Sequence, residues 1–115
     1  RKVLWIPGCG TVTEISQAEE LGAEIVKIFP GIAAGGPSFV KAVKGPRPWT
    51  SFMPTGGVEP TEENLGRWFA AGVTCVGMGS ALVTDKFVRE SDWKGLEMIV
   101  QNTISLIGRL RKTNR

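Results

Sequence analysis

Strand-like apolar segments end at nearly even intervals along this chain of 115 residues. Their last residues are Pro7, Pro30, Pro54 and Gly79, so that successive ends are 23, 24 and 25 residues apart. An interval of this size holds one strand and one helix, and its regularity is typical of a repeat architecture. Strands that are apolar throughout and alternate with amphipathic helices indicate a parallel sheet covered by helices.

Helix signals separate these strands. Thr11 or Thr13 can cap a first helix that Gly22 ends. Apolar residues recur at helical spacing from Trp93 to Leu110, which predicts a long final helix. The expected helices cover residues 11–21, 37–45, 60–71, 81–89 and 92–110.

Four strand–helix units in one domain, residues 1–115, are compatible with two architectures. One is a small open, doubly wound sheet, and the other is half of an eight-stranded (β/α) barrel. In both architectures functional residues gather at the carboxyl ends of the strands.

Composition narrows the function. The chain has no histidine, which excludes histidine-based catalysis and histidine metal sites. Cys9 and Cys75 have no metal-site spacing and are too few for a disulfide scaffold, so a reducing cytoplasm is expected. There is no apolar run of about 18 residues, which argues against a membrane span. The net charge of +3 comes without a basic stripe among aromatic residues, which argues against nucleic-acid binding.

Lys27 stands in the middle of an apolar strand that ends in Pro30-Gly31. A buried ammonium is costly, and a neutral amine in an apolar pocket is a nucleophile that attacks carbonyl groups. The alternative is that the side chain reaches water from a strand face or strand end. The strand itself leaves both interpretations open.

Two glycine-rich turns follow the third and fourth strands. They are Thr55-Gly56-Gly57 and the segment that ends in Gly79-Ser80. Exposed backbone amides before a helix form an anion site, although tight turns also need such glycines. Glu14 and Glu59 are the carboxylates closest to strand ends, and neither has the setting of a general acid–base.

The motifs occur together in a recognisable order. They are Ile6-Pro7-Gly8-x-x-Thr11-x-Thr13-Glu14, Val26-Lys27-Ile28-Phe29-Pro30, Met53-Pro54-Thr55-Gly56-Gly57-Val58 and Gly77-Met78-Gly79-Ser80. Over residues 3 to 83 the chain thereby resembles the second half of the 2-keto-3-deoxy-6-phosphogluconate / 4-hydroxy-2-oxoglutarate aldolases.

This resemblance implies a (β/α)8 barrel of the TIM type, to which the chain contributes strands 5–8, and a class I aldolase that needs no metal or cofactor. The products would be pyruvate and either glyceraldehyde 3-phosphate or glyoxylate, in a cytoplasmic enzyme that is usually a homotrimer. Lys27 corresponds to the Schiff-base lysine. The residues that would bind the distal phosphate or carboxylate, or line the pocket, are Pro7, Phe29, Thr55, Gly56, Gly57, Gly79 and Ser80.

One part of the family pattern has no match. The glutamate that serves the family as general acid–base, with an arginine and a threonine near it, belongs to the first half of the barrel. The sequence is therefore expected to be a fragment of a longer chain or a half-barrel that pairs with another. Two rivals to the aldolase follow, namely a non-catalytic phosphate-binding half-barrel and a different lysine-dependent or phosphate-binding barrel enzyme.

Overall fold

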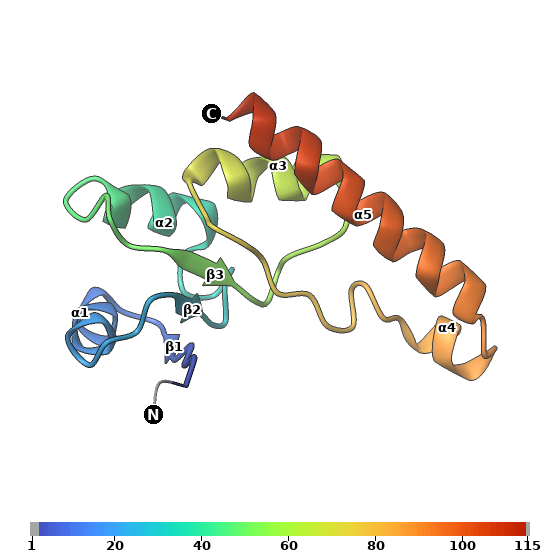
Figure 1. The fold of residues 1–115 in the computed structure, drawn as a ribbon, viewed down its shortest axis with the longest axis horizontal. Helices are drawn as coiled ribbons and strands as arrows, with labels where there is room; N and C mark the ends of the chain where they lie inside the picture. Colours follow the sequence, from blue (N-terminus) through green and yellow to red (C-terminus); the bar gives the residue numbers. More distant parts are fainter. Residues whose placement is uncertain (1–2, 115) are drawn as a thin grey trace.

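The computed structural model describes residues 3–114, which form three short strands and five helices (Figure 1). The strands are β1 (Gly8–Cys9), β2 (Val26–Ile28) and β3 (Phe52–Pro54). The helices are α1 (Val12–Glu20), α2 (Gly36–Lys44), α3 (Glu62–Ala71), α4 (Asp85–Arg89) and α5 (Trp93–Thr113). The predicted single domain of residues 1–115 also includes residues 1, 2 and 115, which lie outside the described part. The extent of the domain stays a prediction.

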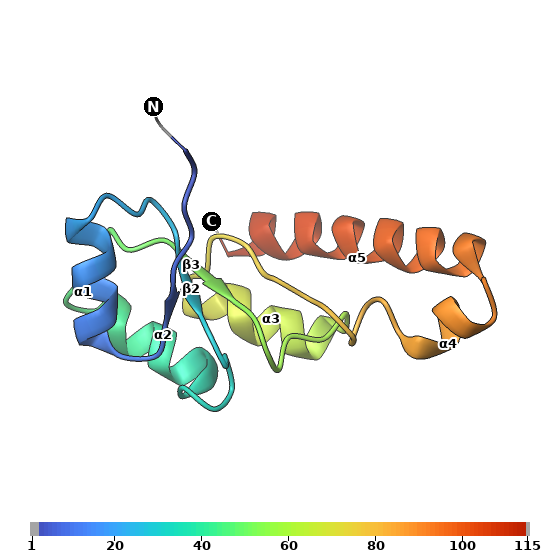
Figure 2. The ribbon, with the colours of Figure 1, turned by 90° about the horizontal axis from the view of Figure 1, so that it is seen from below.

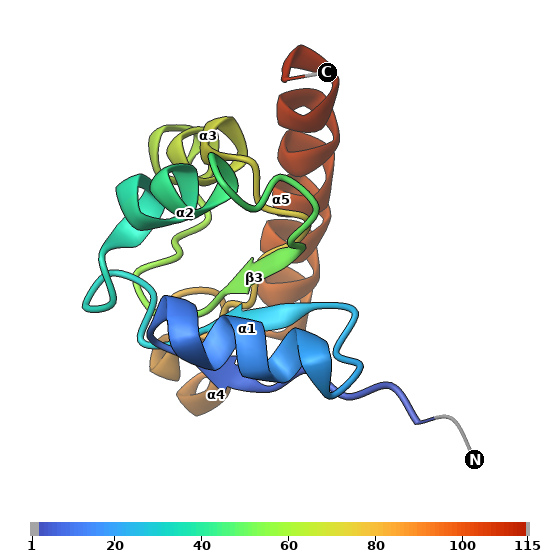
Figure 3. The same cartoon turned by 90° about the vertical axis from the view of Figure 1, so that its left-hand side faces the viewer.

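The strands form one parallel sheet in the order β1-β2-β3. Alternate side chains of a strand point to opposite faces. Those of Val26, Ile28 and Phe52 lie on the buried face, where helices α1, α2 and α3 supply most of the other core residues. The largest buried side chain of that core is Trp68 of α3. Figure 3 shows α2 and α3 side by side over the sheet.

The prediction of a (β/α)8 barrel with four strands in this chain is wrong for the described residues. Residues 73–80, expected as a fourth strand, form no strand and join β3 through a single parallel bridge between Thr55 and Gly77. The carbonyl of Pro54 accepts a hydrogen bond from the Gly77 amide, so Pro54 faces this segment. Because proline has no amide hydrogen to return, the ladder cannot continue there.

The amino-terminal strand is also shorter than expected. Residues 3–7 are extended without ladder pairing, and β1 comprises Gly8 and Cys9 alone. The Pro7 carbonyl accepts from the Lys27 amide at 2.8 Å, but Pro7 itself has no hydrogen to donate. The sheet that results has three strands rather than the four that the spacing predicts.

The helix predictions are confirmed more closely. Thr11 is the residue that caps α1, and it forms a capping box in which its hydroxyl accepts from the Glu14 amide while the Glu14 carboxylate accepts from the Thr11 amide. Asp92 caps α5 by accepting from the Gly95 amide at 2.9 Å. Between them the 81–89 region yields only the five-residue helix α4, preceded by a turn.

The carboxyl-terminal part of the chain forms an arm. Helix α5 packs on α3 at one end and on α4 at the other, and its first turns with α4 extend away from the sheet (Figure 2). The radius of gyration is accordingly 15.1 Å, whereas a compact domain of this length has about 13 Å.

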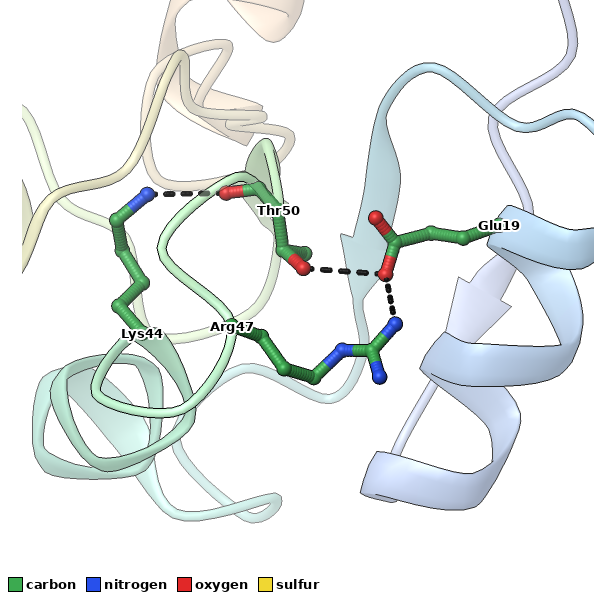
Figure 4. A network of polar contacts seen from close by, with 4 residues as sticks. All are labelled: Glu19, Lys44, Arg47 and Thr50. Carbon is green, nitrogen blue, oxygen red and sulfur yellow. Dashed lines mark hydrogen bonds and ion pairs between the residues drawn. The ribbon is translucent and has the colours of Figure 1, made fainter.

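A polar network joins α1 to the connection between α2 and β3 (Figure 4). The Glu19 carboxylate accepts from the Arg47 guanidinium at 2.6 Å and from the Thr50 hydroxyl at 3.1 Å. Lys44 donates to the Thr50 carbonyl at 3.0 Å, and Thr50 is fully buried. The network fixes how the α2–β3 connection enters β3, and thereby where the turn after β3 begins.

Candidate active site

Three residues form a row across the sheet on the face opposite the core. Gly8, Lys27 and Met53 are paired in register on neighbouring strands. Lys27 lies between the buried residues Val26 and Ile28, so its side chain points to the other face, where it is half-buried. The sequence left open whether Lys27 points inward or outward, and the structure places it on the half-exposed face in the central strand.

Phe29 provides the apolar surface next to Lys27. The Nζ atom of Lys27 lies 5.2 Å from the centroid of the Phe29 ring, within the range of a cation–π contact. Phe29 itself is 53% exposed. The lysine amine is therefore held against an aromatic ring at the carboxyl end of β2, where a ligand can reach both groups.

The loops after β2 and β3 are joined by two hydrogen bonds. The Gly31 amide donates to the Thr55 carbonyl at 2.7 Å, and the Ile32 amide donates to the Gly56 carbonyl at 3.2 Å. A Cβ atom on Gly31 would collide with the Gly56 carbonyl, so only glycine permits this approach. The strand that carries Lys27 and the Thr55-Gly56-Gly57 turn are thus one connected unit.

These hydrogen bonds also orient the amides of the turn. In a trans peptide the N–H points opposite to the carbonyl. Because the Thr55 and Gly56 carbonyls point to the β2 loop, the Gly56 and Gly57 N–H groups point away from it. The parallel bridge between Thr55 and Gly77 directs the Gly56 N–H toward the Gly77 carbonyl, whereas the Gly57 N–H has no acceptor within residues 3–114. Gly56 and Gly57 have φ of +92° and +76°, and successive backbone N–H groups in turns of this kind are donors that anions bind in proteins.

The hydroxyl of Thr55 lies beside this turn. It is buried and has no hydrogen-bond partner in the described part of the chain. Gly77 lies directly against it, and a Cβ atom there would collide with the Thr55 hydroxyl oxygen. A buried hydroxyl without a partner is uncommon and is a group that a ligand can satisfy.

Gly79 and Ser80 are not brought into the same unit. Both are exposed, and the Gly79 carbonyl accepts from the Leu82 and Val83 amides in a local turn. Helix α4 starts only at Asp85, so Ser80 does not precede a helix terminus as the sequence suggested. Their link to the Thr55 turn is the bridge at Gly77.

The carboxylate of Glu14 is already occupied. It accepts from the Gly10 amide at 2.6 Å and from the Thr11 amide at 3.0 Å. The hydrogen bond from the Gly10 backbone is the main reason why the pKa of Glu14 lies below its usual value, and the Thr11 amide and hydroxyl act in the same direction. Glu14 therefore serves the start of α1, as expected.

The pKa of the Cys9 thiol is raised, mainly by burial and then by the negative charges of Glu14 and Glu19.

Two side chains of α3 that sequence reasoning did not select contact the turn. Asn64 and Trp68 both donate to the Gly57 carbonyl, at 3.0 and 3.3 Å. In the sequence Trp68 has the spacing of an apolar core residue of this helix, and nothing there marks it as a donor to the turn. The only available signal was a polar residue three positions after the helix cap Thr61, where a capping box usually has glutamate or glutamine.

A cavity of about 460 Å³ lies between α2 and α3. It contains none of the predicted site residues, although Asn64 and Trp68 lie in its wall. Its lining residues are Ile32, Pro37, Ser38, Lys41, Asn64, Arg67, Trp68, Ala70 and Ala71.

Among residues 3–114 no group of three or more histidine, cysteine, aspartate or glutamate side chains could hold a metal ion. Within the same residues no helix is long and apolar enough to cross a membrane.

Comparison with known proteins decides the family. The family model described as "Aldolase: KDPG and KHG aldolase" matches residues 1–99. The chain belongs to the KDPG and KHG aldolase family. A 2-dehydro-3-deoxy-phosphogluconate aldolase of Pseudoalteromonas atlantica is 34% identical over 100 residues, which cover 87% of this chain and 46% of that relative. A 2-dehydro-3-deoxy-6-phosphogalactonate aldolase of Escherichia coli is 46% identical over 77 residues, which cover 66% of this chain and 36% of that relative.

Solved structures of the aldolase family resemble this fold. The KDPG aldolase of Legionella pneumophila, solved with pyruvate captured as a covalent carbinolamine intermediate, matches with a TM-score of 0.72 and 31% identity. That match covers 88% of this chain and 47% of the Legionella chain. This chain thus spans about half the length of the aldolases that it matches.

Proposed function

We propose that this chain carries the Schiff-base lysine and the anion-binding turn of a class I aldolase that acts on 2-keto-4-hydroxy acids. The observation that supports this most directly is the connection between the Lys27 strand and the Thr55-Gly56-Gly57 turn through the Gly31 and Ile32 amides. A nucleophile and an anion site held in one unit suit a substrate with a keto group at one end and an anionic group at the other.

The chemistry assigns one task to Lys27. Its neutral amine adds to the C2 carbonyl, and loss of water from the carbinolamine gives an iminium ion. The C3–C4 bond then breaks, its electrons move into the iminium to give an enamine, and the C4 hydroxyl loses its proton to become the aldehyde. Protonation at C3 and hydrolysis release pyruvate and regenerate Lys27. The Legionella relative, with its covalent carbinolamine of pyruvate, supports the first step.

The other predicted residues bind and orient the substrate. Phe29, with its ring beside the Lys27 amine, and Pro7, whose carbonyl holds the Lys27 amide, shape the end at which the keto acid reacts. The Gly56 and Gly57 amides and the Thr55 hydroxyl bind the distal phosphate or carboxylate. Gly79 and Ser80 would join them if the exposed turn that carries them closes over the ligand.

The substrates that fit this proposal are 2-keto-3-deoxy-6-phosphogluconate, which gives glyceraldehyde 3-phosphate, and 4-hydroxy-2-oxoglutarate, which gives glyoxylate. Residues of this chain match the nucleophile and the anion site but not the family's proton-transferring glutamate. Metal-free catalysis and the homotrimer also stay predictions.

Reductive trapping tests the proposal at the bond that Lys27 itself forms. The protein is incubated with pyruvate and sodium borohydride, digested and analysed by mass spectrometry, and the adduct is expected on Lys27. The variant Lys27→Met should lose the adduct. Lys41→Met is the matched control, because Lys41 is an exposed lysine of α2 and the variant should be labelled like the wild type.

The result that contradicts the aldolase is an unlabelled Lys27 in the folded wild-type protein. If inorganic phosphate still perturbs the Gly56 and Gly57 amides in that case, the non-catalytic phosphate-binding protein is the better description. The hydrogen-bonded Thr55-Gly56-Gly57 turn is the observation that supports this second candidate.

A further inference from the structure

We infer that Asn64 and Trp68 are positioning residues that hold the end of the anion-binding turn in place through the Gly57 carbonyl. The inference rests on the proposed function for one point only, the assignment of the Thr55-Gly56-Gly57 turn as the anion site. Neither side chain is needed at the reacting atoms, because both act from helix α3 on the backbone of the turn.

The Gly57 carbonyl accepts two hydrogen bonds from buried side chains. The Asn64 Nδ2 atom lies 3.0 Å from it and the Trp68 Nε1 atom 3.3 Å from it. A carbonyl oxygen has two lone pairs, so both are used. Trp68 is fully buried and Asn64 is 8% exposed, and buried donors of this kind lose free energy when they are left without an acceptor.

Asn64 holds the chain on both sides of this carbonyl. Its Oδ1 atom accepts from the Glu59 amide at 2.9 Å, and its backbone N–H donates to the Thr61 hydroxyl that caps α3. An asparagine side chain offers a donor and an acceptor together, whereas an ionised glutamate at this position offers acceptors alone. The residue type therefore matches the task of joining the Gly57 carbonyl to the start of the helix.

The consequence for the turn follows from peptide geometry. The carbonyls of Thr55, Gly56 and Gly57 are all engaged, the first two by the β2 loop and the third by α3. Because each peptide is planar and trans, the bonds from the β2 loop orient the Gly56 and Gly57 N–H groups, while the bonds from α3 fix the next peptide, Gly57–Val58, at which the turn ends. A glycine backbone otherwise rotates freely. The hydrogen bonds to the Gly57 carbonyl therefore fix the part of the turn that the bonds to the Thr55 and Gly56 carbonyls leave free to rotate.

Two variants remove hydrogen bonds to the Gly57 carbonyl by different routes. Trp68→Phe keeps an aromatic ring in the core and deletes only the N–H donor, whereas Asn64→Ala deletes the hydrogen bonds to Gly57 and to Glu59. The matched controls are Trp93→Phe and Asn102→Ala, because both residues are exposed on α5, outside the turn. All proteins are compared at a temperature at which each is folded by circular dichroism.

The probe is inorganic phosphate, titrated into isotope-labelled protein while the Gly56 and Gly57 amide resonances are followed. These resonances are expected to shift in the wild type, and the Kd for phosphate is expected to rise by about three- to tenfold in Trp68→Phe and in Asn64→Ala. Labelling of Lys27 with pyruvate and borohydride should stay at the wild-type level in both variants, because pyruvate has no distal anion.

Three results would overturn the inference. They are a wild-type protein whose Gly56 and Gly57 amides do not respond to phosphate, variants that bind phosphate within about twofold of the wild type, and variants whose Lys27 labelling falls as far as their phosphate affinity. The last result would mean that Asn64 and Trp68 stabilise the fold as a whole rather than the anion-binding turn. Failure of the aldolase is distinguishable, since it leaves Lys27 unlabelled in the wild type while phosphate still shifts the two amides.

Discussion

Replacing Gly57 by alanine tests how firmly the turn after β3 is held. Gly57 has a φ of +76°, a conformation that residues with a Cβ atom rarely adopt. Its missing Cβ position is also occupied, because an alanine there would collide with the Cγ1 atom of Ile32 and lie 2.8 Å from the Ile32 Cβ atom. Two separate penalties are therefore expected.

The magnitude follows from these two terms. A positive φ costs an alanine about 1–2 kcal/mol, and forcing an extra carbon into an occupied position adds about 1–3 kcal/mol. Ile32 is 54% exposed, so its side chain can partly move aside and the lower half of the second range applies. The free energy of unfolding should fall by about 2–4 kcal/mol in Gly57→Ala.

A double-mutant cycle separates the two penalties. Urea unfolding is measured for the wild type, Gly57→Ala, Ile32→Ala and the double variant. Ile32→Ala removes Cγ1 and Cδ1 but keeps the Cβ atom at 2.8 Å, so in that background the cost of Gly57→Ala should fall toward, without reaching, the backbone cost of about 1–2 kcal/mol. Gly108→Ala on exposed α5 is the matched control and should stabilise by about 0.5–1 kcal/mol, since nothing lies near its Cβ position.

The reasoning is refuted by either of two outcomes. A Gly57→Ala variant that loses less than about 0.5 kcal/mol would mean that the turn is not held at positive φ. An equal loss in the wild-type and Ile32→Ala backgrounds would mean that contact with Ile32 contributes nothing. The first outcome would also remove the physical basis for the anion site.

Two further predictions concern the scaffold. Glu19→Ala leaves the largely buried Arg47 guanidinium without its partner and should lower the free energy of unfolding by about 1–3 kcal/mol. Glu97→Ala, which breaks an exposed pair with Lys94, should change it by about 0.5 kcal/mol or less, and equal losses in the two variants would contradict the role of the network. The hydrogen-bonded Glu14 carboxylate has a pKa below its usual 4.5, so the stability that it contributes is present above that value and is lost as the pH falls through the lower, folded-state pKa. Unfolding midpoints between about pH 6 and pH 3 should therefore fall less steeply in Glu14→Gln than in the wild type, and identical slopes would contradict this.

Much of the local structure follows from short-range chemistry that a sequence displays. The Thr11 and Glu14 spacing predicts the start of α1, and the apolar stripe predicts α5. Apolar residues on both sides of Lys27 predict that it is on a strand, but they leave open whether its side chain is buried or reaches water. These features depend on residues a few positions apart.

The failures depend on contacts between distant residues. Residues 73–80 are as apolar as a strand, but pairing needs an amide hydrogen from the neighbour, and Pro54 has none. The bond from Asn64 to the Gly57 carbonyl depends on the path of the loop between them, which no residue pattern in that loop specifies. The sequence pointed to Lys27 and the glycine turn as a candidate site, which stays a prediction, and it did not point to the α3 side chains that contact the turn.

The two hydrogen bonds between the loops after β2 and β3 also have a consequence for substrate length. They fix the separation between the backbone of Lys27 and the Gly56 and Gly57 amides, by strand register and by the few residues from Lys27 to Gly31. In the proposed aldolase this backbone separation determines how many carbons the substrate has between its keto group and its distal anion. Inserting or deleting one residue between Lys27 and Gly31 would change the substrate length that fits, whereas exchanging a side chain in that segment would not.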